Sequence, residues 1–180
     1  IAIAVAVGIG AGTTALISNS IGAKEDRKAS MYVAQSIIFA IAISIFVTLF
    51  GLNFSDELLR IMGSSEQSIT LTREYLDIIF FGAIIVLAQL SLNGTLNAQG
   101  DTKSYRNVLI FTFFLNIFLN PLFIFGYGFI PAFGIAGLAI ATLLSQFVGL
   151  IYLINKVYCC KLKKYLHVEC FKPKLDYIIT

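Results

Sequence analysis

The feature that most constrains this sequence is a long stretch without charge. No Asp, Glu, Lys, Arg or His occurs from Asn107 to Asn155. Such a run is surrounded by lipid or by other apolar helices rather than by water. The whole chain is 58% apolar and has a mean hydropathy of +0.86, which excludes an ordinary soluble domain. The sequence therefore predicts a membrane protein.

Charged residues fall into short clusters between solidly apolar runs of about 20 residues, the length of a transmembrane helix. This pattern predicts an all-α, polytopic helical membrane protein with about five transmembrane helices. We expect a transmembrane lobe over residues 1–158, a basic cytoplasmic loop over 159–175 and the start of a further segment at 176–180. A short amphipathic helix is expected at the membrane surface over residues 53–63. The predicted spans cover residues 1–21, 29–52, 75–97, 105–126 and 135–157.

The distribution of Lys and Arg predicts the orientation. If the chain crosses the membrane at each predicted span, eleven of the 13 basic residues fall on one side, and Arg60 and Arg73 fall on the other. Loops rich in Lys and Arg stay in the cytoplasm. We therefore expect a multi-pass protein of the cell (plasma) membrane, with its basic loops and tail cytoplasmic. The net charge of +3 follows from this rule and does not suggest nucleic-acid binding.

Polar side chains recur at four-residue spacing within the apolar spans. Residues four apart lie on one face of a helix, so each row forms a stripe. Stripes that face a shared interior would line a water-accessible cavity, and their carbonyl oxygens could bind a cation or a polar substrate. Alternatively, the same side chains hold neighbouring helices together by hydrogen bonds. The rows include Gln89 and Asn93 in the third span, Asn116 and Asn120 in the fourth, and Thr142 in the fifth.

Pro121 directly follows Asn120 inside the fourth span. Proline lacks a backbone N–H and its ring clashes with the preceding turn, at a cost of about 3 kcal/mol in an ordinary helix. Membrane helices tolerate it where nearby groups satisfy the freed carbonyl. We therefore expect a bend at Pro121, either as a hinge or as a simple packing kink.

Small residues recur at the same spacing in the first span. Ala4, Gly8 and Gly12 are four residues apart, and Gly10 and Ala11 add to this small surface. Such a stripe lets another helix approach closely, and we expect this face of the first span to pack tightly.

The spans lack the groups that catalysis or proton transfer by a carboxylate would need. No ionisable residue lies near the middle of a predicted span, and no nucleotide-binding motif is present. The sequence therefore predicts a protein that is not an enzyme and has no cofactor. Cys159, Cys160, His167 and Cys170 match no strong zinc pattern, so no metal site is expected.

Four stretches, in the right order and covering nearly the whole chain, resemble the multidrug and toxic compound extrusion (MATE) family. They are 8–23 with the charged loop that follows, 99–103, 116–126 and 133–142. The resemblance implies helices two to six of the first of two six-helix lobes. Because the chain begins inside one apolar run and ends at the start of another, we expect it to be part of a longer protein.

The resemblance further implies an antiporter that exports cationic, amphipathic compounds by alternating access, driven by a Na⁺ or H⁺ gradient. The expected partners are the lipid bilayer, small organic cations and the second lobe. Asn116, Asn120 and Thr142 match positions of the family's cavity. The family commonly has Asp at the place of Asn120, so the amide here puts proton coupling in this lobe in doubt.

Two other functions fit the same helix pattern. A flippase for lipid-linked oligosaccharides shares the helix plan, but its cavity should carry Arg or Lys for a pyrophosphate. A membrane receptor or scaffold that transports nothing would use the polar stripes to hold its helices together.

Overall fold

The computed structural model describes residues 2–61, 66–127 and 131–158. The regular elements of this part of the chain are helices, which confirms the predicted all-α class. The expected loop over 159–175 and the segment at 176–180 lie outside the described residues. The helices are α1 (Ala2–Gly22), α2 (Asp26–Ile61), α3 (Glu66–Phe81), α4 (Ala83–Ala98), α5 (Thr102–Phe125) and α6 (Gly134–Tyr158).

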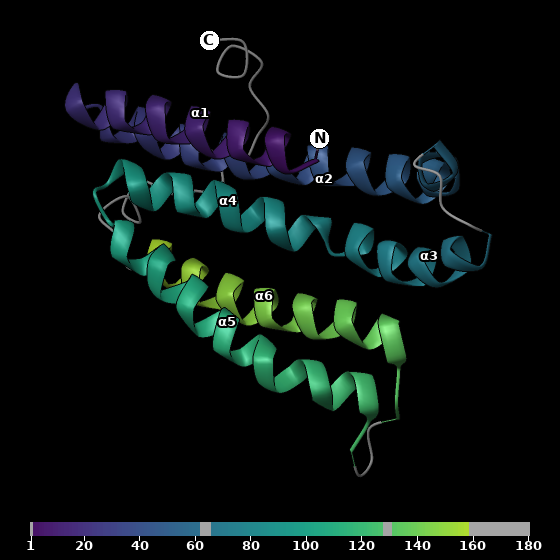
Figure 1. The fold of residues 1–180 in the computed structure, drawn as a ribbon. Helices are drawn as coiled ribbons and strands as arrows, with labels where there is room; N and C mark the ends of the chain where they lie inside the picture. Colours follow the sequence, from purple (N-terminus) through teal and green to yellow (C-terminus); the bar gives the residue numbers. More distant parts are fainter. Residues whose placement is uncertain (1, 62–65, 128–130, 159–180) are drawn as a thin grey trace.

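The helices form three adjacent layers. Figure 1 shows α1 and α2 side by side along one side, α4 and α3 end to end in the middle, and α5 and α6 along the other side. Helix α4 contacts both outer pairs, and α3 contacts α2 and α6. One buried cluster joins α1 to α2 through Ile17 and Val33, and another joins α4, α5 and α6 through Leu96, Val108 and Leu153. The central α4 therefore connects the two outer pairs.

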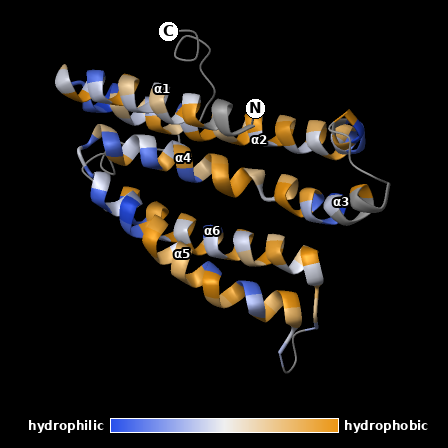
Figure 2. Cartoon of the chain, in the orientation of Figure 1, coloured by the Kyte–Doolittle hydropathy of each residue, from blue (hydrophilic) through white to orange (hydrophobic). Residues whose placement is uncertain are grey.

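Three of the described helices are long and apolar enough to cross a membrane, namely α2 over Asp26–Glu57, α5 and α6. The pair α3–α4 makes a fourth if its two parts form one bent span. The number of crossings therefore stays a prediction. Hydrophilic residues gather at the end of the molecule that holds the α1–α2 and α4–α5 turns, and the helices between the ends are largely apolar (Figure 2).

The prediction of a separate surface helix over residues 53–63 is wrong. The helical backbone of α2 runs without a break from Asp26 to Ile61. Its last turns are held against α3, since Arg73 of α3 pairs with Asp56 at 2.6 Å. Asp56 and Glu57 suit the start of a helix, but they are equally compatible with the interior of a longer one. Local sequence alone did not distinguish the two arrangements.

The sequence predicts one continuous span over 75–97, whereas the structure has two helices in this region. Helices α3 and α4 meet at Gly82, and their axes are bent by 46°. A Cβ at Gly82 would lie 2.0 Å from a methyl group of Leu143 in α6. The bend thus occurs where another helix occupies the space of a side chain. The apolar sequence around Gly82 carries no local sign of this tertiary contact.

The close helix approach predicted for α1 occurs on another face of the helix. An added Cβ would meet nothing within 4 Å at Gly8 or at Gly12. Instead, a Cβ at Gly94 of α4 would lie 2.7 Å from the carbonyl oxygen of Gly10. Thr14 adds a hydrogen bond of 3.2 Å to the Gly94 carbonyl. The small residues allow a tight α1–α4 contact, as expected of their type, but through Gly10 and Gly94.

Candidate functional site

A tight hairpin between α5 and α6 positions the candidate site. Helix α5 ends at Gly126, whose φ of 72° lies in the left-handed region that favours glycine. The N–H of Phe133 donates back to the Phe123 carbonyl at 3.0 Å. A Cβ at Gly137 would lie 2.3 Å from that same carbonyl oxygen. The absence of a side chain at Gly137 therefore lets the start of α6 lie directly against the end of α5.

This close approach brings three of the predicted site residues together. Asn120 Nδ2 donates to Asn116 Oδ1 at 2.7 Å, one turn earlier on α5. Asn116 Nδ2 lies 3.4 Å from Thr142 Oγ1 on α6, and Thr142 Oγ1 donates to the Leu138 carbonyl at 2.9 Å. The three side chains form a chain of hydrogen bonds that starts at Asn120 on α5 and ends at the Leu138 carbonyl of α6. We call Asn116, Asn120 and Thr142 the polar centre.

The polar centre leaves one acceptor unused. Asn120 Oδ1 is buried and accepts no hydrogen bond from the described residues. Buried polar groups are normally paired, because an unpaired one costs about 1–3 kcal/mol. An amide oxygen of this kind suits a donor group or a hard cation such as Na⁺. The centre carries no ionisable side chain, so its own three residues cannot take up or release a proton at ordinary pH.

The other two predicted site residues lie on α4, outside the hydrogen-bonded chain of the polar centre. Gln89 is buried, and its Nε2 donates to the Gln146 carbonyl of α6. This contact is the interhelical role that the sequence left open as an alternative. Asn93 is half-buried, and its Oδ1 is a buried acceptor with no partner among the described residues. Asn93 Oδ1 is therefore unpaired among the described residues, whereas the Gln89 amide joins α4 to α6.

Pro121 lies inside α5, which remains helical through Phe125. Its side chain is exposed. Because proline has no N–H, the carbonyl four residues earlier, that of Ile117, lacks its usual helical partner. A hinge at this position stays a prediction.

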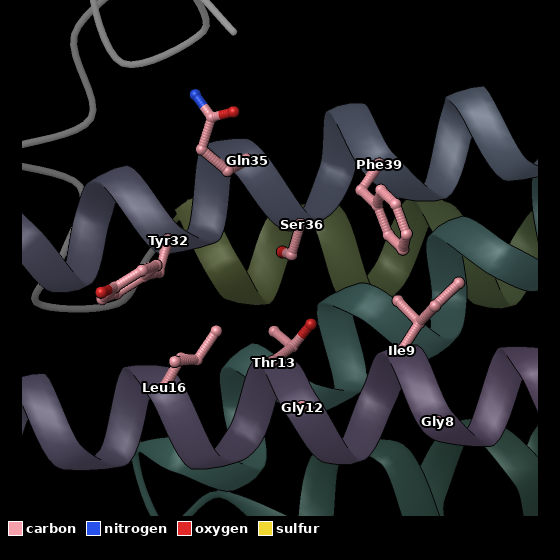
Figure 3. A pocket seen from close by; sticks show the side chains of 9 residues that line it. All are labelled: Gly8, Ile9, Gly12, Thr13, Leu16, Tyr32, Gln35, Ser36 and Phe39. Carbon is pink, nitrogen blue, oxygen red and sulfur yellow. The ribbon is translucent and has the colours of Figure 1, made fainter. Parts of the chain in front are cut away.

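A cavity with a mainly apolar lining lies between α1 and α2, and it was not predicted from the sequence. It has a volume of about 220 Å³ and is lined in part by Thr13, Tyr32, Gln35 and Ser36. The side chains of Thr13 and Ser36 point into the space between the two helices (Figure 3). Gly8 and Gly12 form part of its wall. Ser91 of α4 donates to Ser36 at 2.9 Å, so this side is also tied to the central helix. Gln35, an amide within the predicted span 29–52, was the sequence signal that could have indicated it.

Two acidic residues of the described part of the chain are paired with one arginine. Asp77 of α3 pairs with Arg73 at 3.7 Å, and Arg73 also binds Asp56. No group of three His, Cys, Asp or Glu residues within the described ranges could hold a metal ion. Cys159, Cys160, His167 and Cys170 lie outside those ranges.

Comparison with known proteins identifies the family. The MatE family profile matches residues 1–122, about two thirds of the chain. The chain belongs to the MATE family. A probable multidrug resistance protein NorM from Thermotoga maritima is 40% identical over 151 residues, covering 81% of this chain and 32% of the relative. A FAD transporter from Shewanella oneidensis is 30% identical over 146 residues, with the same two coverages.

Solved MATE structures have the same fold. An inward-facing multidrug resistance MATE transporter of the MOP superfamily matches with a TM-score of 0.89 and 29% identity, over 99% of this chain and 40% of the transporter. An outward-facing structure matches with a TM-score of 0.84 and 29% identity, over 98% and 39%. The chain spans about a third of the length of the curated relatives that it matches.

These matches confirm the family resemblance and the class of helical membrane protein expected from the sequence. MATE proteins are multi-pass membrane transporters rather than enzymes. The described helices therefore correspond to part of a MATE-family membrane protein.

Proposed function

We propose that this chain is part of a secondary active efflux transporter, an antiporter that exports organic cations by alternating access. The observation that carries the proposal is the similarity of this one lobe to MATE transporters in both inward- and outward-facing conformations, with TM-scores of 0.89 and 0.84. A lobe that fits both states suits a mechanism in which lobes rock against each other around a central site. The second lobe, on this proposal, is supplied by the rest of the protein.

A Na⁺ or H⁺ gradient would drive export. The unpaired Oδ1 atoms of Asn120 and Asn93 support Na⁺ as the ion bound by this lobe, because amide oxygens bind hard cations without changing protonation. Further oxygen ligands would come from elsewhere in the protein. If protons drive transport, the titrating group lies outside the polar centre.

The absence of basic residues from Asn107 to Asn155 supports cationic substrates. A polyanion such as a pyrophosphate needs Arg or Lys partners when it leaves water. An organic cation needs only amide dipoles and the faces of aromatic rings. The same absence argues against a flippase for lipid-linked oligosaccharides. One Shewanella relative is named a FAD transporter, and FAD is an anionic compound that can be tested beside a cation.

Efflux from drug-sensitive cells that express the full-length protein tests the proposal. Cells loaded with ethidium are energised first with a Na⁺ gradient and then with a proton gradient, and the loss of fluorescence is recorded. We expect efflux of ethidium under the Na⁺ gradient and no export of FAD. FAD export without ethidium efflux would overturn the substrate class. No efflux under either gradient, with normal membrane expression, would contradict the exporter.

A further inference from the structure

An apolar groove lies between α5 and α6, nearer to the start of α5 and the end of α6 than the polar centre is. Its volume is about 370 Å³. Phe111 precedes Asn116 by five residues, which places it about 140° around the helix from Asn116. The groove and the polar centre are therefore separate. The groove is lined by Asn107, Val108, Phe111, Val148, Gly149 and Tyr152.

The walls of this groove suit a hydrocarbon chain. Phe111 is 56% exposed and Val148 is 40% exposed, although both are apolar. Gly149 forms the floor, where a Cβ would lie 2.8 Å from Val108. In a membrane, such an open apolar surface faces lipid.

Two basic side chains contact lining residues at one end of the groove. Lys156 Nζ is 5.6 Å from the centre of the Tyr152 ring. Arg106 Nη2 is 3.4 Å from Asn107 Oδ1. Lys103 lies one turn before Asn107 on the same face of α5. The groove thus has an apolar body and a basic mouth, where α5 begins and α6 ends.

One acidic group also lies near this mouth, but it already has partners. Asp101 accepts hydrogen bonds from the Ser104 N–H at 3.0 Å and from the Ser104 hydroxyl at 2.6 Å. Lys156 is close enough to act on it electrostatically. The remaining charge of the mouth is positive, because Lys103 and Arg106 add to Lys156.

We propose that this groove binds an anionic phospholipid, with an acyl chain along Phe111 and Val148 and the phosphate at Arg106 and Lys156. Basic residues between transmembrane helices at the membrane surface bind anionic headgroups. The long side chains of Arg and Lys can reach the headgroup level from a helix end. With the orientation predicted from the basic residues, the lipid comes from the cytoplasmic leaflet. This proposal does not depend on the transported substrate or on the coupling ion.

Native mass spectrometry of the purified full-length protein tests the site. Phosphatidylglycerol or phosphatidylcholine with identical acyl chains is titrated into the detergent solution, and bound lipids are counted. We expect the wild type to prefer phosphatidylglycerol. The double variant R106Q/K156Q should weaken this preference by about fivefold for each charge removed. R106K/K156R should retain it.

Two further variants locate the effect. K24Q/R27Q removes Lys24 from the α1–α2 turn and Arg27 from the first turn of α2, at the same end of the molecule, and should keep the preference. Val148→Phe fills the groove from its open side and should reduce bound phosphatidylglycerol without changing any charge. The melting temperature of each variant shows that it is folded. The proposal is wrong if the wild type has no preference, if K24Q/R27Q loses as much as R106Q/K156Q, or if Val148→Phe binds as much as the wild type.

Discussion

At the scale of the residue, a substitution at Asn120 distinguishes an ion-binding role of the polar centre from a packing role. Asn120→Ala removes the donor to Asn116 and the unpaired Oδ1. We expect transport to fall at least about fivefold, the equivalent of one lost hydrogen bond, with little change in membrane yield. Reduced yield with unchanged transport per molecule would instead assign Asn120 to packing.

Asn120→Asp replaces the amide by a group that titrates. We expect the pH dependence of ethidium efflux to differ from that of the wild type, with rates changing by up to about tenfold per pH unit in the range where the carboxyl titrates. Asn155→Asp is the matched control, because Asn155 is exposed at the end of α6. A pH profile of Asn120→Asp identical to that of the wild type would exclude this position from the ion path.

Asp101 caps the start of α5, and its charge makes stability depend on pH. The hydrogen bonds from Ser104, more than the nearby charge of Lys156, lower the pKa of this carboxyl below its ordinary value. A group with a lowered pKa in the folded state stabilises the protein at neutral pH. This contribution is lost as the pH falls through the folded pKa.

We therefore expect Asp101→Ala to destabilise the protein by about 1 kcal/mol at neutral pH, the usual cost of losing an N-cap. Asp101→Asn keeps an acceptor for the Ser104 N–H but cannot titrate. Its melting temperature in detergent should stay near the wild-type value at neutral pH and fall less on acidification. An acid response of Asp101→Asn equal to that of the wild type would contradict this account.

At the scale of the element, the α1–α4 contact depends on one glycine. A Cβ at Gly94 would lie 2.7 Å from the carbonyl oxygen of Gly10, which is backbone and cannot rotate away. We expect Gly94→Ala to push the helices apart and destabilise the lobe by about 1–3 kcal/mol, the usual cost of overpacking. Gly12→Ala is the control, since its Cβ meets nothing within 4 Å. If the melting temperatures of both variants fall equally, the α1–α4 contact does not depend specifically on Gly94.

The helices and the polar centre were predictable to different degrees. Apolar runs and small charged turns indicated where α1, α5 and α6 lie, because burial in lipid demands long apolar segments. The hydrogen bond between Asn116 and Asn120 follows from their four-residue spacing. The break at Gly82 and the Gly10–Gly94 contact were not predictable, since each depends on a residue from a distant helix that fills or approaches the space.

At the scale of the whole molecule, the orientation depends on whether the bent pair α3–α4 crosses the membrane. Lys24 and Lys103 lie in the α1–α2 turn and at the start of α5, at the same end of the molecule (Figure 1). The chain between them contains α2 and then α3–α4. If α2, which is long and apolar enough to span, crosses once, both lysines can face the cytoplasm only if α3–α4 also crosses once. Tyr127, beyond α5, should then face the outside.

Single cysteines at these three positions test this topology, in a background where Cys159, Cys160 and Cys170 are replaced by Ser. A maleimide that cannot cross membranes should label Tyr127→Cys in intact cells, because Tyr127 is 81% exposed. Lys24→Cys and Lys103→Cys should react only after the membrane is permeabilised. A permeant maleimide, as control, should label all three. Labelling of Lys103→Cys but not Lys24→Cys in intact cells would show that α3–α4 enters and leaves on one side, and would contradict the distribution of basic residues as a guide to this protein's topology.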